Sequence, residues 1–187
     1  MPRKSVHVRM MNKAVDYLGR YASSRHKLGQ ILSRFASRKL TDYDAEDIST
    51  AIQQTIDRCG QLGYLDDRQF AVTLARSQRR RGRSQTMIHQ RLRQHALSDD
   101  IIVYALAVAD KNSVNGDLQA AIRFAQRRRL GPFAKRHSTH RQRLDPHEWK
   151  KRDLGAMARA GFSIVISQQV LNHKNPDTID DLLCQPE

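Results

Sequence analysis

The sequence contains few residues that interrupt helices. Only 5 of its 187 residues are proline, and none of these lies between Arg3 and Gly131. Proline lacks a backbone N–H and disrupts helix interiors, so a long stretch without it favours helices. Apolar residues in this stretch recur at intervals of three and four, as at Ile48, Ile52 and Ile56. This spacing is typical of amphipathic helices and predicts an all-α fold.

Long hydrophobic runs are also missing. The chain has no run of about 18 apolar residues that could span a membrane, and residues 1–11 lack the apolar segment of a secretory signal. The two cysteines, Cys59 and Cys184, form neither a CxxC motif nor a disulfide framework, which fits a reducing compartment. We therefore expect a cytoplasmic protein.

Motifs for catalysis or cofactor binding are absent as well. There is no GxxxxGK[ST] loop for ATP, no GxGxxG after a strand and no serine nucleophile elbow. The histidines within residues 137–147 have no cysteine or carboxylate at a metal-finger spacing. The pairs Asp66-Asp67 and Asp99-Asp100 are better explained as helix caps than as Mg²⁺ ligands of a small nuclease. We expect neither an enzyme nor a protein that requires a cofactor.

Positive charge, in contrast, is abundant. The chain has 33 Lys and Arg against 19 Asp and Glu, a formal net charge of +14. Such a balance indicates a polyanionic partner, which could be nucleic acid, an acidic protein surface or an anionic membrane. The aromatic fraction of 6% argues against a platform for stacking bases. The basic segments carry Ala and Gln where a membrane-surface helix would need Trp, Phe or Leu, so no membrane partner is expected.

Many arginines gather in two clusters at the ends of predicted helices, and each cluster contains an arginine triplet, at 79–81 and at 127–129. A single arginine there would simply favour the helix dipole and remain solvated. Two clusters at corresponding places favour a surface that binds phosphates or carboxylates, because the guanidinium fork pairs with two oxygens. The predicted partner-binding residues are Arg76, Arg79, Arg80, Arg81, Arg83, Arg91, Arg93, Arg123, Arg127, Arg128 and Arg129.

The stretch GYLDDRQFA at residues 63–71 predicts the start of a capped helix. We expect Asp66 to be the N-cap, with Gln69 at the capping-box position. Leu65 and Phe70 then form the hydrophobic staple, and Asp67 adds favourable charge in the first turn. The structural motif therefore comprises Tyr64, Leu65, Asp66, Asp67, Phe70 and Ala71. The buried stripe of this helix is expected to comprise Phe70, Ala71, Leu74 and Ala75.

Helical units of this kind recur along the chain. Apolar residues follow Ser98 and Ser163 at the same offsets, and both serines, like Ser84, are expected to cap helices. We expect three tandem three-helix repeats that stack into an elongated molecule. The expected divisions are a basic segment at 1–11, repeats at 12–63, 66–110 and 117–173, a long basic loop at 131–146 within the third repeat, and a loose acidic tail at 174–187.

The middle repeat resembles the RecX family, small regulators of the bacterial recombinase RecA. The strings GYLDDRQFA at 63–71, RRRG at 79–82 and IHQRLRQHALSDDII at 88–102 are similar to that family's pattern of capped helix, basic turn and second helix. The third repeat agrees through ARAGFS at 158–163. The first repeat agrees at Ala14, Tyr17, Leu18, Ser24, Leu28 and Leu32.

The chain departs from the family pattern at three places. Lys27 stands before Leu28, where the family usually has Glu, and Asp153 occupies a position where an apolar residue is expected. The segment 38–47 is longer than usual. These differences concern the surface chemistry of the outer repeats more than the fold.

The resemblance implies an elongated, curved molecule of three-helix repeats that binds the RecA filament on DNA and restrains its assembly or activity in recombination and repair. The implied partners are the RecA filament and the phosphates of single- and double-stranded DNA, with no cofactor. Because the closing repeats have polar outer faces, we expect a monomer. The residues alone also fit a helix-turn-helix-like or nucleoid-associated DNA-binding protein that acts without the recombinase.

Overall fold

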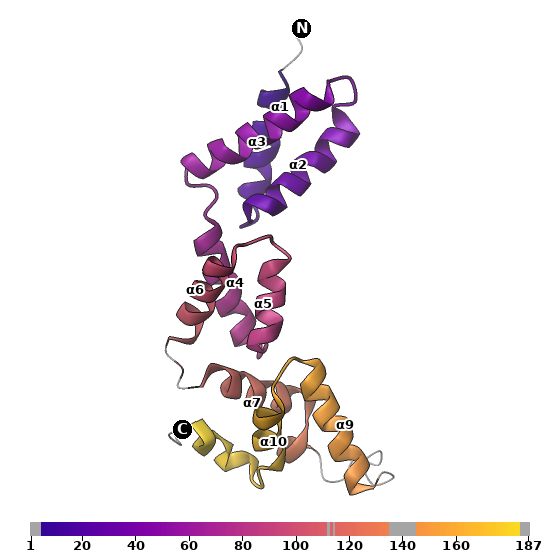
Figure 1. Cartoon of the computed structure of the whole chain (residues 1–187), viewed down its shortest axis with the longest axis vertical. Coiled ribbons are helices and arrows are strands. Elements are labelled where there is room, and N and C mark those ends of the chain that lie inside the picture. The colour runs from indigo at the N-terminus through magenta and orange to yellow at the C-terminus, as the bar shows by residue number, and fades with distance from the viewer. Residues whose placement is uncertain (1–4, 112, 114, 135–144, 184–187) are drawn as a thin grey trace. The chain divides into compact units, whose positions relative to one another are not determined.

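The computed structural model describes residues 5–111, 113, 115–134 and 145–183, and the regular elements of these residues are all helices (Figure 1). The predicted all-α class is confirmed. Parts of the expected basic segment, basic loop and tail, at 1–4, 135–144 and 184–187, lie outside the described residues. Cys184 and all but the last histidine of the 137–147 stretch belong to these parts.

The helices fall into three successive groups of three. They are α1 (Val6–Leu18), α2 (Arg25–Lys39) and α3 (Ala45–Gln61), then α4 (Asp67–Arg80), α5 (Gln85–Arg93) and α6 (Asp99–Asp110), then α7 (Gly116–Arg128), α9 (Pro146–Arg159) and α10 (Ile164–Asn172). Two short 3₁₀ helices, η1 (Gly131–Phe133) and η2 (Pro176–Leu183), belong to the last group. The predicted three-helix repeats are thus present.

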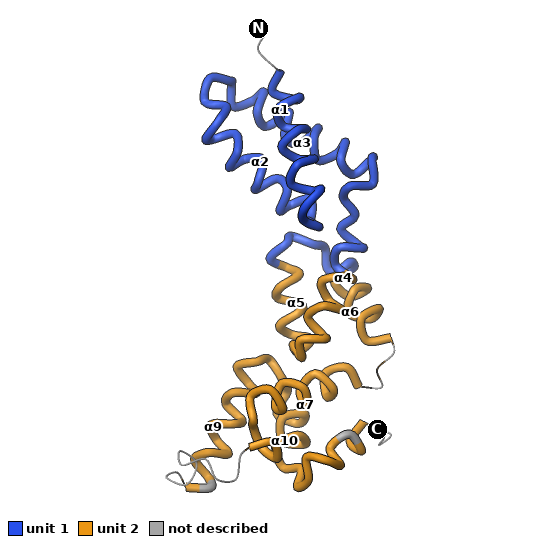
Figure 2. The backbone as a smooth tube through the Cα atoms, turned by 180° about the vertical axis from the view of Figure 1, so that it is seen from behind, with its two compact units in different colours: residues 1–71, 94–101 blue, residues 72–93, 102–187 orange. Residues whose placement is uncertain are grey.

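The chain divides into two compact units (Figure 2). The first unit comprises Met1–Ala71 and Gln94–Ile101, and the second comprises Val72–Arg93 and Ile102–Glu187. The boundary between them runs through the helices of the middle repeat. All of the predicted partner-binding arginines belong to the second unit.

The first unit is built on one hydrophobic core, in which α1, α2 and α3 pack against one another. The apolar stripes at intervals of three and four supply this core, as their period predicts. Its fully buried side chains include Met10, Leu28, Leu32, Ala51 and Cys59. Burial raises the pKa of the Cys59 thiol, so this cysteine acts as a small apolar core residue.

The two adjacent aspartates at the start of α4 have different structural tasks. Asp66 caps α4, since its Oδ1 accepts the backbone N–H of Gln69 at 2.9 Å. Asp67 turns to α2, where its Oδ1 accepts the backbone N–H of Arg25 at 2.8 Å. Ser24 satisfies a further N–H of α2 through its hydroxyl. Asp66-Asp67 therefore joins two helix starts, which confirms the predicted cap and adds a second one.

The buried face of α4 differs from the predicted stripe. Phe70 is only partly buried, and its ring packs edge-on against His95 with the ring centroids 4.9 Å apart. Leu74 is partly buried too, whereas Arg79 is almost completely buried. The helix is rotated so that its buried stripe consists of Ala71, Val72, Ala75 and Arg79.

The second unit has a hydrophobic core of its own around the last three helices. Helix α10 packs against α7 and α9, and η2 packs against α7. Fully or nearly fully buried residues of this core include Ala121, Ile122, Ala125, Met157 and Val170. In place of the loose tail expected from residue 174, residues 176–183 form η2 and insert Ile179, which is 1% exposed, into the core.

Serine caps hold the turns of this unit. The Ser84 hydroxyl accepts the N–H of Met87 at 3.3 Å, and the Ser163 hydroxyl accepts the N–H of Ile166 at 3.3 Å. Both caps were expected from the sequence.

We predict that replacing Asp66 with Ala lowers the free energy of unfolding by about 1 kcal/mol, because an alanine cannot accept the Gln69 N–H. Asp66→Asn, which keeps an acceptor oxygen, should retain most of that stability. Urea unfolding followed by far-ultraviolet circular dichroism measures both. Equal losses for the two variants would show that the carboxylate charge, and not the cap hydrogen bond, is what matters.

Candidate functional site

Arg79, one of the predicted partner-binding residues, lies inside the second unit. Its Nε and Nη2 donate to the two carboxylate oxygens of Asp110 at 2.8 and 2.6 Å, and its Nη1 donates to Asp117 at 2.5 Å. The same Nη1 donates to the carbonyl of Arg83 at 3.1 Å. Only 7% of Arg79 is exposed. Arg79 is therefore occupied by internal partners and is not part of an exposed binding surface.

The charge of Arg79 is stabilised in place. Burial disfavours the charged guanidinium, but hydrogen bonds and attraction from Asp110 and Asp117 outweigh it and raise the pKa of Arg79. Asp117 also accepts the backbone N–H of Gln85, at 2.6 Å. The ends of α4 and α6 and the starts of α5 and α7 are thus joined at one cluster, which we call the Arg79 hub (Arg79, Asp110 and Asp117).

Two glycines allow the turn between α4 and α5 to approach its neighbours closely. Gly82 has φ +66°, and a Cβ there would lie 3.1 Å from the carbonyl oxygen of Ala120 on α7. Gly161 has φ +81°, and a Cβ there would lie 2.6 Å from the Ser84 hydroxyl oxygen. That hydroxyl donates to the Ala160 carbonyl at 2.7 Å. The turn is therefore fixed to both α7 and the end of α9.

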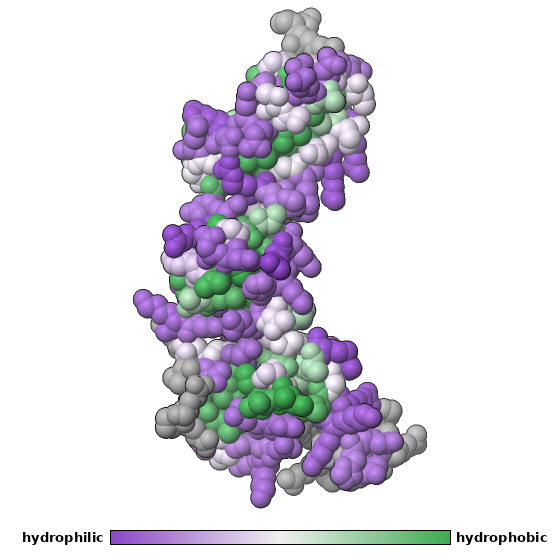
Figure 3. Space-filling model, viewed as in Figure 1, coloured by the Kyte–Doolittle hydropathy of each residue, from purple (hydrophilic) through white to green (hydrophobic). Residues whose placement is uncertain are grey.

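The other predicted arginines are on or near the surface. Arg123 is partly buried, and the exposed residues are Arg76, Arg80, Arg81, Arg83, Arg91, Arg93, Arg127, Arg128 and Arg129. Arg91 and Arg93 each take part in an interaction within the protein. Arg129 ends α7 in the left-handed conformation, with φ 55°. Hydrophilic residues also cover much of the face drawn in Figure 3.

Three of these arginines, from both predicted clusters, lie around one recess of about 200 Å³. Arg76 and Arg80 come from α4 and Arg123 comes from α7, while Arg79 and Asp110 of the hub also line the recess. The two clusters are thus brought to one surface, and we call these three residues the arginine recess. Such a cluster of guanidinium groups suits phosphate or carboxylate oxygens.

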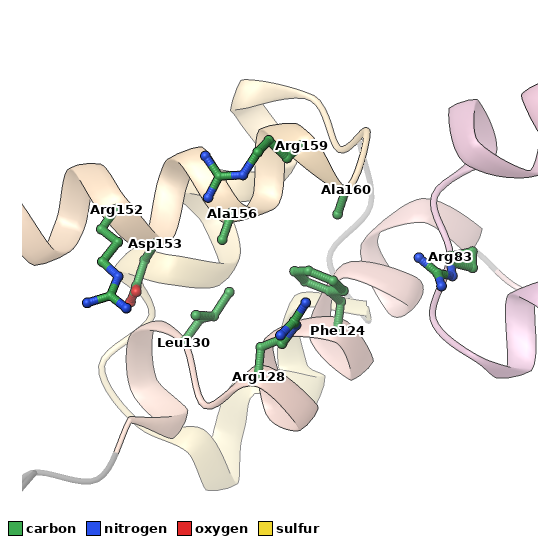
Figure 4. Close-up of a pocket in the computed structure, with 9 residues that line it drawn as sticks. All are labelled: Arg83, Phe124, Arg128, Leu130, Arg152, Asp153, Ala156, Arg159 and Ala160. Atoms are coloured by element: carbon green, nitrogen blue, oxygen red, sulfur yellow. The ribbon is translucent and has the colours of Figure 1, made fainter.

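A second hollow, of about 380 Å³, collects four arginines from three elements (Figure 4). Arg83 comes from the turn after α4, Arg128 from the end of α7, and Arg152 and Arg159 from α9. Arg152 and Arg159 were not predicted from the sequence, because neither belongs to an arginine triplet. Their spacing of seven residues places both on one face of a helix, and this spacing is the feature of the sequence that could have indicated them.

Asp153 accounts for a departure noted in the sequence. It is 6% exposed, and its Oδ2 accepts the backbone N–H of Gly131 at 2.9 Å. Gly131 has φ +53° and follows α7, so the carboxylate satisfies a backbone donor of the turn into η1. An apolar residue at 153 could not accept this hydrogen bond.

No group of three or more His, Cys, Asp or Glu among the described residues could hold a metal ion. None of the helices in the described part of the chain is long and apolar enough to cross a membrane.

Comparison with known proteins places these observations in a family. The family model described as "RecX, second three-helix domain" matches residues 66–106. The "Regulatory protein RecX" of Myxococcus xanthus (strain DK1622) is 33% identical over 177 residues, which cover 94% of this chain and 90% of the relative. The chain belongs to the RecX family. The "Regulatory protein RecX" of Agrobacterium fabrum is 26% identical over 176 residues, 94% of this chain and 88% of the relative.

Solved structures support the RecX fold. A "Crystal structure of regulatory protein RecX" superposes with a TM-score of 0.65 at 15% identity, over 90% of this chain and 72% of that one. A "Crystal structure of RecX from Lactobacillus salivarius" gives 0.64 at 14% identity, over 90% and 96% of the two chains. The family resemblance seen in the middle repeat is confirmed.

We predict that Arg79→Ala lowers the free energy of unfolding by about 3 kcal/mol, because it leaves two carboxylates in a partly buried site without their cation. The neighbouring exposed Arg80→Ala is the control and should change stability by less than about 0.5 kcal/mol. Chemical denaturation of both variants measures the difference. Equal stability of the two variants would mean that the Arg79 hub does not hold the unit together.

Proposed function

We propose that this protein regulates the RecA recombinase, mainly by restraining it, and that it binds the RecA–DNA filament through the arginine recess and the exposed arginines around it. The supporting observation is that arginines of both clusters meet at one recess, while Arg79 beneath them is neutralised by carboxylates. Membership of the RecX family and the net charge of +14 support the same proposal.

The physical basis of the proposal is attraction to a polymer. A filament on DNA presents rows of phosphates and acidic side chains, and several weak contacts to adjacent positions act together. Charge complementarity also raises the rate of encounter at moderate salt. If the affinity for the filament differs from that for free subunits, binding shifts the polymerisation equilibrium. This mechanism needs no catalytic group and no cofactor in the regulator.

The alternative function is that of a DNA-binding protein that acts without the recombinase. The three-helix units favour it, since such units also place helices in the major groove. The affinity of a plain DNA binder falls steeply with salt. The logarithm of its binding constant changes with the logarithm of the salt concentration with a slope of about −0.9 for each neutralised phosphate. A filament regulator should instead bind more tightly when the recombinase is on the DNA. Fluorescence anisotropy of labelled DNA with and without recombinase separates the two.

We predict that the protein inhibits ATP hydrolysis by the recombinase on single-stranded DNA at well below one molecule per recombinase subunit. Such a ratio is expected if each molecule affects several adjacent subunits of the filament. The measurement is a titration of the purified protein at physiological salt. Inhibition only at concentrations that coat the DNA would favour simple competition for phosphates.

We predict that replacing Arg76, Arg80 and Arg123 together with Gln raises the half-inhibitory concentration by about 10-fold or more, because charge-assisted hydrogen bonds are lost. The matched control replaces Arg34, Arg38 and Lys39 of α2 with Gln and removes the same amount of charge. It should change inhibition by less than about 2-fold, the size expected for general electrostatics. Equal effects of the two triple variants would show that net charge, and not the recess, carries the interaction.

A further inference from the structure

The hollow formed by Arg83, Arg128, Arg152 and Arg159, here called the four-arginine pocket, has features of a specific ligand site. All four arginines are exposed, and none of them forms an ion pair with another described residue. The one carboxylate among the lining residues, Asp153, already accepts the Gly131 N–H. With four arginines and one carboxylate, the lining of the pocket carries an excess of positive charge.

The pocket is held in shape by contacts made elsewhere. The Arg79 hub bonds the carbonyl of Arg83, and Ser84 next to it bonds the carbonyl of Ala160. These contacts position the turn that carries Arg83 relative to α9. A ligand would meet arginines whose backbones are already fixed, and less entropy would be lost on binding.

One wall of the pocket is apolar. Phe124, Leu130, Ala156 and Ala160 lie between the arginines, as the close-up shows (Figure 4). Phe124 is braced by Phe162, with the ring centroids 5.6 Å apart. The volume of about 380 Å³ lies within the range of small-molecule pockets, about 300 to 1,000 Å³. The lining is mainly polar, with a small apolar part, so it suits a ligand that carries several negative charges and one flat group.

We propose that the four-arginine pocket binds a nucleotide, with its phosphate groups held by the arginines and its base placed against the apolar wall. Phosphate groups offer several acceptor oxygens to the guanidinium forks around the pocket, whereas a lone carboxylate offers two. A base supplies the flat surface that the wall by Phe124 accommodates. This inference goes beyond the proposed function, because the binding is measured without the recombinase and can fail independently of it.

The test is isothermal titration of the full-length protein with ATP and with inorganic triphosphate, without recombinase, at an ionic strength of about 0.15 M. ATP is expected to bind about 10-fold or more tightly than triphosphate, since only ATP can use the apolar wall. Trp149, the single tryptophan of the chain, lies on α9 one turn before Arg152 and gives a second, fluorescent readout. Equal affinity for the two ligands would overturn the assignment of the base.

Three variants locate the binding. Arg152→Gln and Arg159→Gln should each weaken ATP binding about 10-fold, the loss expected for a charge-assisted hydrogen bond. Arg38→Gln, which removes an exposed charge from α2, is the control and should have no effect beyond about 2-fold. If Arg38→Gln weakened ATP binding as much as the two pocket variants, the binding would depend on overall charge and not on the pocket, and the proposal would be overturned.

Ala156→Leu separates the two halves of the site. Leucine keeps a good helix-forming residue in α9 but occupies the apolar wall. This variant should lose most ATP affinity and keep triphosphate affinity, with an unchanged circular dichroism spectrum. Loss of both affinities in a folded protein, or of neither, would contradict the proposed position of the base.

Competition identifies the natural form of the ligand. If a 5′-phosphorylated single-stranded oligonucleotide competes for the pocket at a lower concentration than unlabelled ATP does, the natural ligand is a nucleotide within a strand. A weaker oligonucleotide indicates a free nucleotide, and either result supports the proposal. A glutamate-rich peptide that displaces ATP more effectively than both would overturn it in favour of an acidic protein segment.

Discussion

A buried charge has to be paired inside the protein, and in the second unit that constraint determines how four helices meet. The buried guanidinium of Arg79 loses its water, and its five N–H donors, fixed in one plane, need correctly placed oxygens to accept them. Asp110 supplies two oxygens from the end of α6, and Asp117 supplies one from the first turn of α7. The helix ends cannot shift relative to one another without breaking a charged hydrogen bond. The Arg79 hub therefore fixes the arrangement of the helices as well as stabilising the unit.

The surface chemistry of the unit follows from this interior arrangement. The hub places α4 beside the start of α7, which brings Arg76 and Arg80 to the same recess as Arg123. It also holds the turn that carries Arg83 near α9, where Arg152 and Arg159 lie. The buried Arg79 thus helps to position the exposed arginines that line the two hollows. The two basic hollows share one support but face different combinations of groups, the first polar and the second partly apolar.

Local features of the fold could be predicted from the sequence because their physics is local. The cap at Asp66 and the serine caps at Ser84 and Ser163 depend on a few neighbouring residues, and the apolar spacing depends only on the helical period. The role of Arg79 could not be predicted in this way, since the triplet at 79–81 reads as three equivalent surface arginines. Its two carboxylates lie 31 and 38 residues further along the chain. Arg152 and Arg159 depend equally on tertiary structure, as does the burial of Ile179 in η2.

The distinction between paired and exposed arginines bears on how a strongly basic protein can be selective. Net charge alone attracts any polyanion, and its effect declines with salt. Selectivity requires guanidinium groups fixed at defined spacings, so that one anionic partner satisfies several of them together. In this chain Asp110 and Asp117 bind Arg79 and so fix the helices that carry the exposed arginines, although each carboxylate lowers the net positive charge by one. The acidic residues beside the arginines therefore do not weaken the basic surface so much as give it a defined geometry.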